Sequence, residues 1–166
     1  MKIPEICNLL RSELLNNGYE YGFYLDGKKY KPDMSNGFDE EYARLSKTAY
    51  RVQPPLVTMR EKTGTCVDTV LVMKKLLDEH DITSKIWLTF NKVKGTPHMI
   101  LTFEAEGKIV YLELTPQSSK PFYGKEIVYE SEHDMITEFH KNGYDITDVT
   151  RAVVIGSSPE ALLSLK

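Results

Sequence analysis

Three strand-like segments separated only by short turns constrain the fold of this chain more than any other feature of its sequence. They cover residues 84–90, 99–103 and 108–114, and glycine and proline lie in the turns between them. Parallel strands need a long crossover connection, which linkers of this length cannot provide. The sequence therefore predicts an antiparallel meander in the second half of the chain.

The residues before this meander favour helices. Apolar side chains recur at helical spacing over residues 3–17 and, most clearly, over residues 66–79, with a weaker candidate at 38–50. Residues 19–37 are rich in Tyr, Gly, Asp and Lys and favour a loop with room for one strand. Pro54-Pro55 is expected to stop any helix at that point.

After the meander, the sequence predicts further alternation of strand and helix. A strand is expected at 126–129, then a helix from the Ser131 N-cap to about Asn142, and a last strand at 151–155. Ser158-Pro159-Glu160 is expected to start a short C-terminal helix. Helices followed by an antiparallel meander are typical of the α+β class.

Length and charge narrow the possible functions. The 166 residues suit one domain, 1–166, with an N-terminal helical part at 1–59 and the motif-bearing region at 60–117. Acidic side chains number 24 against 21 basic ones, and this balance gives no electrostatic basis for binding nucleic acid. No apolar run approaches a membrane span, and the N-terminus does not resemble a signal peptide, so we expect a cytoplasmic protein. Two cysteines make no disulfide framework and fit a reducing compartment.

Cys66 is the first candidate for chemistry, because it opens the clearest helix directly after Gly64-Thr65. A free thiol of pKa ~8.5 is only about 3% thiolate at neutral pH, and the thiolate is the nucleophile. A helix N-terminus favours an anion by only ~0.3–1 kcal/mol, so a histidine paired with the thiolate must supply the larger effect. The backbone N–H of Cys66 is also a candidate donor to the oxyanion that forms on a carbonyl under attack.

His98 and Glu113 supply the other two groups. If the second and third strand segments form a hairpin about Glu106-Gly107, residues whose numbers sum to about 211–213 face each other, and 98 and 113 sum to 211. A carboxylate beside the imidazole can fix its tautomer and stabilise the imidazolium. Taken singly, each of the three residues is more typical of a structural position, but chance alone is not expected to place Glu113 opposite His98.

Three short blocks of sequence resemble the Cys, His and Asp motifs of the transglutaminase-like superfamily, which has a papain-like fold. They are Thr63-Gly64-Thr65-Cys66-Val67-Asp68, Pro97-His98 and Leu112-Glu113-Leu114-Thr115-Pro116. The resemblance implies a central helix that bears the cysteine and packs on an antiparallel sheet. It also implies Cys66 as nucleophile, His98 as general base and acid, and Glu113 as the residue that orients the histidine.

This sequence departs from the family pattern at several positions. Glu113 replaces the usual aspartate, and the family's tryptophans near the cysteine and histidine are missing. Arg60 stands where papain-like proteases place an oxyanion-hole glutamine. Gln53 and Tyr50 are both open as the second oxyanion donor. Asp68 places a negative charge within one turn of the thiol, which is expected to oppose the thiolate slightly.

The function expected from these residues is that of a cysteine hydrolase, a peptidase or amidase that forms a thioester acyl-enzyme on a protein or peptide substrate. A transglutaminase-type acyl transferase and a catalytically weak binding domain that keeps the fold are the alternatives. No cofactor is implied, and no metal is expected because the remaining histidines lack ligand spacing. Cys7 lies on an apolar helix and is interpreted as a core residue. The oligomeric state is left open.

Overall fold

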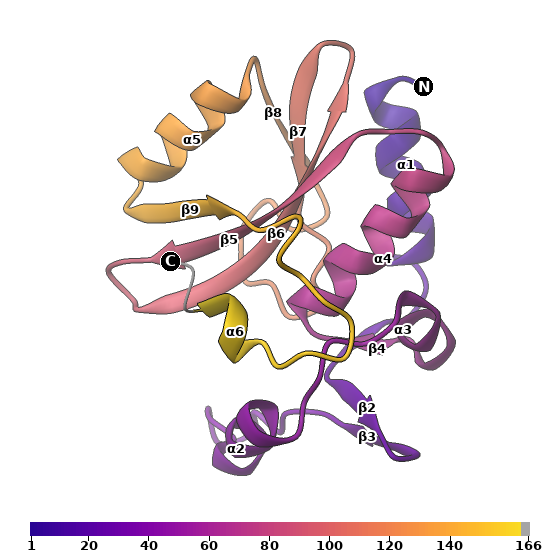
Figure 1. The fold of residues 1–166 in the computed structure, drawn as a ribbon, viewed down its shortest axis with the longest axis vertical. Helices are drawn as coiled ribbons and strands as arrows, with labels where there is room; N and C mark the ends of the chain where they lie inside the picture. Colours follow the sequence, from indigo (N-terminus) through magenta and orange to yellow (C-terminus); the bar gives the residue numbers. More distant parts are fainter. Residues whose placement is uncertain (164–166) are drawn as a thin grey trace.

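A five-stranded antiparallel sheet forms the centre of the protein (Figure 1). The computed structural model describes residues 1–163. The strand order across the sheet is β8-β7-β6-β5-β9, so the meander occupies the middle and the edges come from later segments. The strands are β5 (Ser84–Asn91), β6 (Thr96–Ala105), β7 (Lys108–Leu112), β8 (Glu126–Tyr129) and β9 (Tyr144–Asp148).

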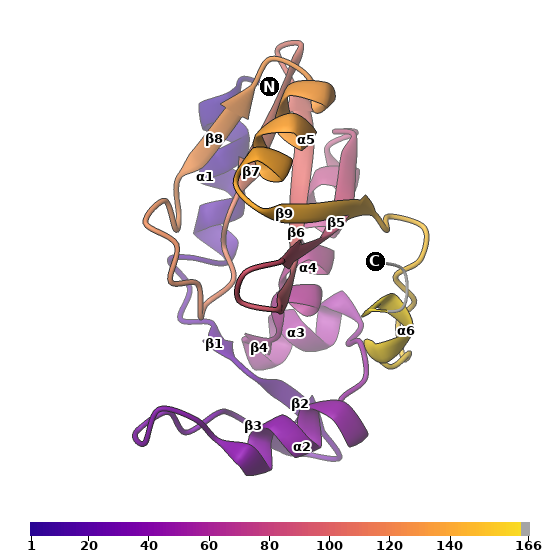
Figure 2. The ribbon, with the colours of Figure 1, turned by 90° about the vertical axis from the view of Figure 1, so that its left-hand side faces the viewer.

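Helices cover both faces of this sheet. The long helix α4 (Cys66–Glu79) and the N-terminal α1 (Ile3–Glu13) pack with one face, and α5 (Glu132–Lys141) packs with the other. Figure 2 shows α4 and α5 on opposite sides of the strands. Because side chains alternate along a strand, Met99 and Leu101 of β6 join the core under α4, while Ile100 between them joins the core under α5. The central strands are buried on both faces, which makes them a rigid platform for a site.

The segments between α1 and α4 form a separate group of small elements below the sheet in Figure 1. The strand β1 (Glu20–Tyr21) pairs in parallel with β4 (Thr63–Gly64), directly before α4. Strands β2 (Phe23–Leu25) and β3 (Lys28–Tyr30) form a hairpin, and the helices α2 (Glu40–Thr48) and α3 (Pro55–Glu61) follow. This part is therefore mixed rather than helical, and residues 19–37 hold three short strands where the sequence predicted one at most.

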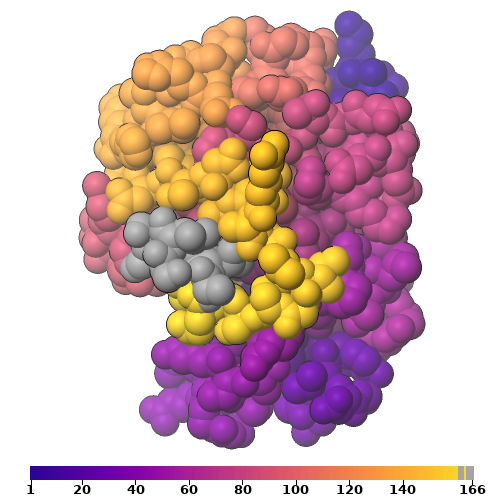
Figure 3. All heavy atoms as spheres, in the orientation of Figure 1, coloured from indigo at the N-terminus to yellow at the C-terminus, as the bar shows by residue number. Residues whose placement is uncertain are grey.

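The C-terminal segment crosses the surface between the sheet and the N-terminal elements (Figure 3, yellow). It contacts the backbone of Val52 twice: Val52 N–H donates to Ser157 O at 2.9 Å, and Gly156 N–H donates to Val52 O at 2.7 Å. The short helix α6 (Glu160–Leu163) follows, as the sequence predicted. Within residues 1–163, no helix has the length and apolar character needed to cross a membrane.

Most of the predicted elements are confirmed. Helix α4 has the predicted bounds, the meander pairs antiparallel, and Ser131 caps α5 by accepting from the backbone N–H of Asp134. The predicted strand at 151–155 is wrong. The edge of the sheet beside β5 is taken by β9, which reaches it directly from the end of α5, and Val154 and Ile155 remain exposed.

Two predicted helix boundaries also differ. Helix α1 ends at Glu13, four residues before the predicted end. Pro54-Pro55 does not exclude a helix, because Pro55 is the first residue of α3. Proline is tolerated there since the first N–H groups of a helix have no partner within it.

Candidate active site

The N-terminus of α4 presents Cys66 as its first residue. Thr65 is the N-cap, and a capping box joins it to Asp68: the Thr65 N–H donates to Asp68 Oδ2 at 3.0 Å, and the Asp68 N–H donates to Thr65 Oγ1 at 3.5 Å. These bonds fix the first turn of the helix. Cys66 itself is partly exposed, and its backbone N–H has no partner within the helix.

Asp68 connects this helix start to the preceding loop rather than lying open beside the thiol. Its side chain is fully buried, and Oδ1 accepts from the Tyr50 hydroxyl at 2.8 Å and from the Gln53 N–H at 2.9 Å. Burial raises the pKa of this carboxyl to about 6, although the bonds from Thr65, Gln53 and Tyr50 act in the opposite direction. The sequence predicted only that the charge of Asp68 would oppose the thiolate. The structure shows that Asp68 also holds the preceding loop against the start of α4.

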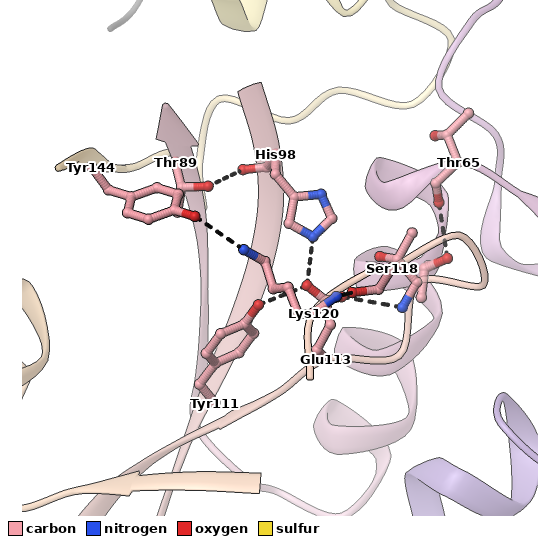
Figure 4. Close-up of polar contacts among 10 residues, drawn as sticks. Thr65, Thr89, His98, Tyr111, Glu113, Ser118, Lys120 and Tyr144 are labelled. Carbon is pink, nitrogen blue, oxygen red and sulfur yellow. Dashed lines mark hydrogen bonds and ion pairs between the residues drawn. The ribbon is translucent and has the colours of Figure 1, made fainter. Parts of the chain in front are cut away.

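His98 and Glu113 lie together at the end of the sheet (Figure 4). His98 Nε2 is 2.6 Å from Glu113 Oε1. The β6–β7 register pairs Thr102 with Tyr111, and continuing it places Glu113 opposite Ile100. His98 is two residues from Ile100 on the same face. His98 and Glu113 are therefore close together, as the sequence predicted. The contact is diagonal across the two strands, because Glu113 lies just beyond the end of β7.

The Glu113 carboxylate accepts from three donors. Besides the His98 ring, the Tyr111 hydroxyl donates to Oε1 at 2.6 Å and the Thr115 N–H donates to Oε2 at 3.2 Å (Figure 4). The side chain is only 3% exposed. Burial raises the pKa of Glu113, but the interactions with His98, Tyr111 and Thr115 outweigh it and the net shift is downward. Glu113 is therefore an ionised carboxylate at neutral pH, held by three hydrogen bonds from described residues.

The imidazole of His98 lies between this carboxylate and Cys66. Burial lowers the pKa of His98, but hydrogen bonding and charge interaction with Cys66 and then with Glu113 raise it to about 10. Because Nε2 is bonded to Glu113, Nδ1 is the nitrogen that remains for Cys66. The Thr89 hydroxyl donates to the His98 backbone carbonyl at 2.9 Å and helps hold this position in β6.

Cys66 and His98 line one cavity of about 270 Å³. Its other walls come from several parts of the chain, including Tyr21, Tyr50, Leu88, Met99, Pro159 just before α6, and Leu163 at the end of α6. The structure thus brings together the three residues that the sequence singled out, beside a hollow with largely apolar walls. Tyr111 was not singled out, although its position two residues before Glu113 places it on the same face of the strand.

Neither of the two residues considered as a second oxyanion donor is available for that role. The Gln53 amide donates to Thr58 Oγ1 at 2.9 Å and to Thr63 O at 3.0 Å, and its oxygen accepts from the Tyr24 N–H. The Tyr50 hydroxyl is already bonded to Asp68 and to Thr65. Both side chains therefore hold the structure around the helix start.

The other candidate residues lie away from this site. Cys7 is fully buried in the core, and burial together with the nearby Glu126 charge raises the pKa of its thiol to about 11. Arg60 is exposed, pairs with Glu61 and lies over the Tyr24 ring. Within the described part of the chain, no group of three or more His, Cys, Asp or Glu side chains is arranged to hold a metal ion.

The chain was compared with models of known protein families and with curated proteins. Neither comparison gives a match.

Proposed function

We propose that this chain is a cysteine-dependent amidase or peptidase of the transglutaminase-like, papain-like type, with Cys66 as nucleophile, His98 as base and acid, and Glu113 as the residue that orients His98. The observation that carries the proposal is the 2.6 Å bond between His98 Nε2 and Glu113 Oε1 beside a thiol at a helix N-terminus. A nucleophile, a base and a third group that orients the base are the parts required for covalent acyl chemistry.

The arrangement supports a thiolate–imidazolium pair in the resting site. The raised pKa of His98 favours the protonated ring, and the ionised Glu113 stabilises that positive charge. With Nε2–H directed to Glu113, the Nδ1 proton is directed to the sulfur. The pair is poised to attack, because the nucleophile needs no separate deprotonation step.

Acylation and hydrolysis then follow in balanced steps. The Cys66 sulfur attacks the carbonyl carbon of an amide, a C–S bond forms, and the carbonyl π electrons move to oxygen. As the tetrahedral intermediate collapses, the C–N bond breaks and His98 gives its proton to the leaving amine. Water attacks the thioester with His98 taking a proton, the C–S bond breaks, and the carboxylic acid and the thiolate are released. An amine in place of water gives acyl transfer instead.

The first test is the pH dependence of iodoacetamide alkylation at Cys66, measured by mass spectrometry in the wild type and in His98→Ala. Alkylation should stay fast well below pH 7 in the wild type, because iodoacetamide reacts with the thiolate and the proposed pair with protonated His98 favours that form. In His98→Ala, alkylation should become fast only near pH ~8.5, which is the pKa of an ordinary thiol.

Cys7 is the internal control, because its buried thiol should resist alkylation in the native protein throughout this range. A profile at Cys66 that is the same with and without His98 would contradict the proposal and leave a binding domain as the better interpretation. Where the pair is found, incubation with p-nitrophenyl acetate and then with a primary amine separates hydrolysis from acyl transfer.

A further inference from the structure

Tyr21 has not entered the mechanism, although its side chain lines the same cavity as Cys66 and His98. We propose that the Tyr21 hydroxyl is the second donor of the oxyanion hole, opposite the backbone N–H of Cys66. The proposal rests on the proposed function and adds the oxyanion-hole donor that the triad of Cys66, His98 and Glu113 does not provide. It also explains how an oxyanion can be stabilised when Gln53 and Tyr50 are engaged elsewhere.

The backbone places Tyr21 directly beside the start of α4. Strand β1 pairs in parallel with β4, and Tyr21 is opposite Gly64, two residues before Cys66. The next residue extends the pairing, since the Gly22 N–H donates to Gly64 O at 3.2 Å. Tyr21 is therefore held at a fixed register against the segment that presents the nucleophile.

The hydroxyl of Tyr21 is available as a donor. Within residues 1–163 it has no hydrogen-bond partner, whereas the Tyr50 hydroxyl in the same cavity is bonded to both Asp68 and Thr65. Burial and then the nearby Cys66, Tyr42 and Asp68 raise the pKa of Tyr21 well above its ordinary value. The group therefore keeps its proton at neutral pH and can donate it in a hydrogen bond.

The oxyanion forms when the sulfur has attacked and the carbonyl π electrons have moved to oxygen. A donor placed for that charge contributes to acylation, but it does nothing for alkylation by iodoacetamide, in which sulfur displaces iodide at a saturated carbon and no oxyanion forms. Removing an oxyanion-hole donor costs about 10²–10³ in rate in other enzymes. The two reagents therefore separate a role at the oxyanion from a role at the thiolate.

The experiment measures both rates at Cys66 in the wild type, Tyr21→Phe and Tyr42→Phe, with p-nitrophenyl acetate for acylation and iodoacetamide for alkylation. Tyr42→Phe is the matched control. The Tyr42 ring centroid is 6.4 Å from that of Tyr21, but Tyr42 does not line the cavity, and its buried hydroxyl has no hydrogen-bond partner among the described residues. The acylation rate of Tyr21→Phe should fall at least about 10-fold, and up to the factor of about 10²–10³ that loss of an oxyanion-hole donor costs in other enzymes. Alkylation should be unchanged in Tyr21→Phe, and both rates should be unchanged in Tyr42→Phe.

Three outcomes would overturn the proposal. Wild-type acylation in Tyr21→Phe would remove Tyr21 from the oxyanion hole and leave the proposed function intact. An equal loss of both rates would show that Tyr21 acts on the thiolate–imidazolium pair or on the fold. A wild-type protein that is alkylated like an ordinary thiol and is not acylated would end this proposal together with the proposed function.

Discussion

Replacing Glu113 with Gln tests the triad at its most buried member. The side chain keeps its size, but it loses the charge that stabilises protonated His98 and presents an NH₂ group where one carboxylate oxygen accepts a bond. A hydrogen bond to a charged group contributes about 1.5–3 kcal/mol. At 1.36 kcal/mol for each factor of ten, alkylation and acylation of Cys66 at pH 6 should fall by about 10- to 150-fold.

The matched control is Glu126→Gln, which makes the same chemical change in a carboxylate that pairs with Arg11, away from the cavity. It should leave both rates unchanged. Far-UV circular dichroism should show that Glu113→Gln keeps the fold, because the substitution adds no volume. Full reactivity of Cys66 at pH 6 in folded Glu113→Gln would refute the reasoning and remove Glu113 from the triad.

Three further predictions concern stability, each measured by urea unfolding. Gly64→Ala should lower the free energy of unfolding by about 1–3 kcal/mol, because the added Cβ would lie 2.8 Å from Asp68 Cβ and 2.9 Å from Thr58 Cγ2. A Gly64→Ala variant as stable as the wild type would show that the residues at the helix start move apart at little cost. The raised pKa of His98, about 10, contributes stability that is complete below about pH 6.5 and is lost as the pH rises towards 10. Between about pH 6.5 and 10, the wild type should therefore lose stability relative to His98→Gln. If the two proteins show the same dependence of unfolding free energy on pH, the raised pKa of His98 is contradicted. Cys7→Ser should lower the free energy of unfolding by about 1–3 kcal/mol, because it places a hydroxyl among buried apolar side chains, and it should leave Cys66 alkylation unchanged.

Local signals were sufficient to predict the two halves of the site. The Gly64-Thr65 sequence before a helical apolar pattern placed Cys66 at a helix start, and the capping box explains why that boundary is sharp. Counting residues about a short turn placed His98 near Glu113, because an antiparallel hairpin has few possible registers. The same counting could not show that the contact is diagonal, since it depends on where the turn sits.

Long-range pairings could not be predicted in the same way. The β1–β4 pair that brings Tyr21 to the site consists of two residues in each strand, which is too short for any periodic pattern. The apolar residues near 151–155 have strand character, yet β9 takes the edge of the sheet because it follows α5 directly. Tertiary competition for one edge decided this outcome, and propensity within the segment carries no information about it.

The two halves of the site are held by separate hydrogen-bond networks. Thr65, Asp68, Tyr50 and Gln53 fix the helix start that carries Cys66. Tyr111 and Thr115 fix Glu113, and through it His98. These networks share no residue, so the position of the sulfur relative to the imidazole depends on how α4 packs against β5 and β6. That packing is buried apolar surface, which is dense and resists deformation. The precision of the polar site therefore depends on the apolar core beneath it, and each network needs only to orient its own side chains.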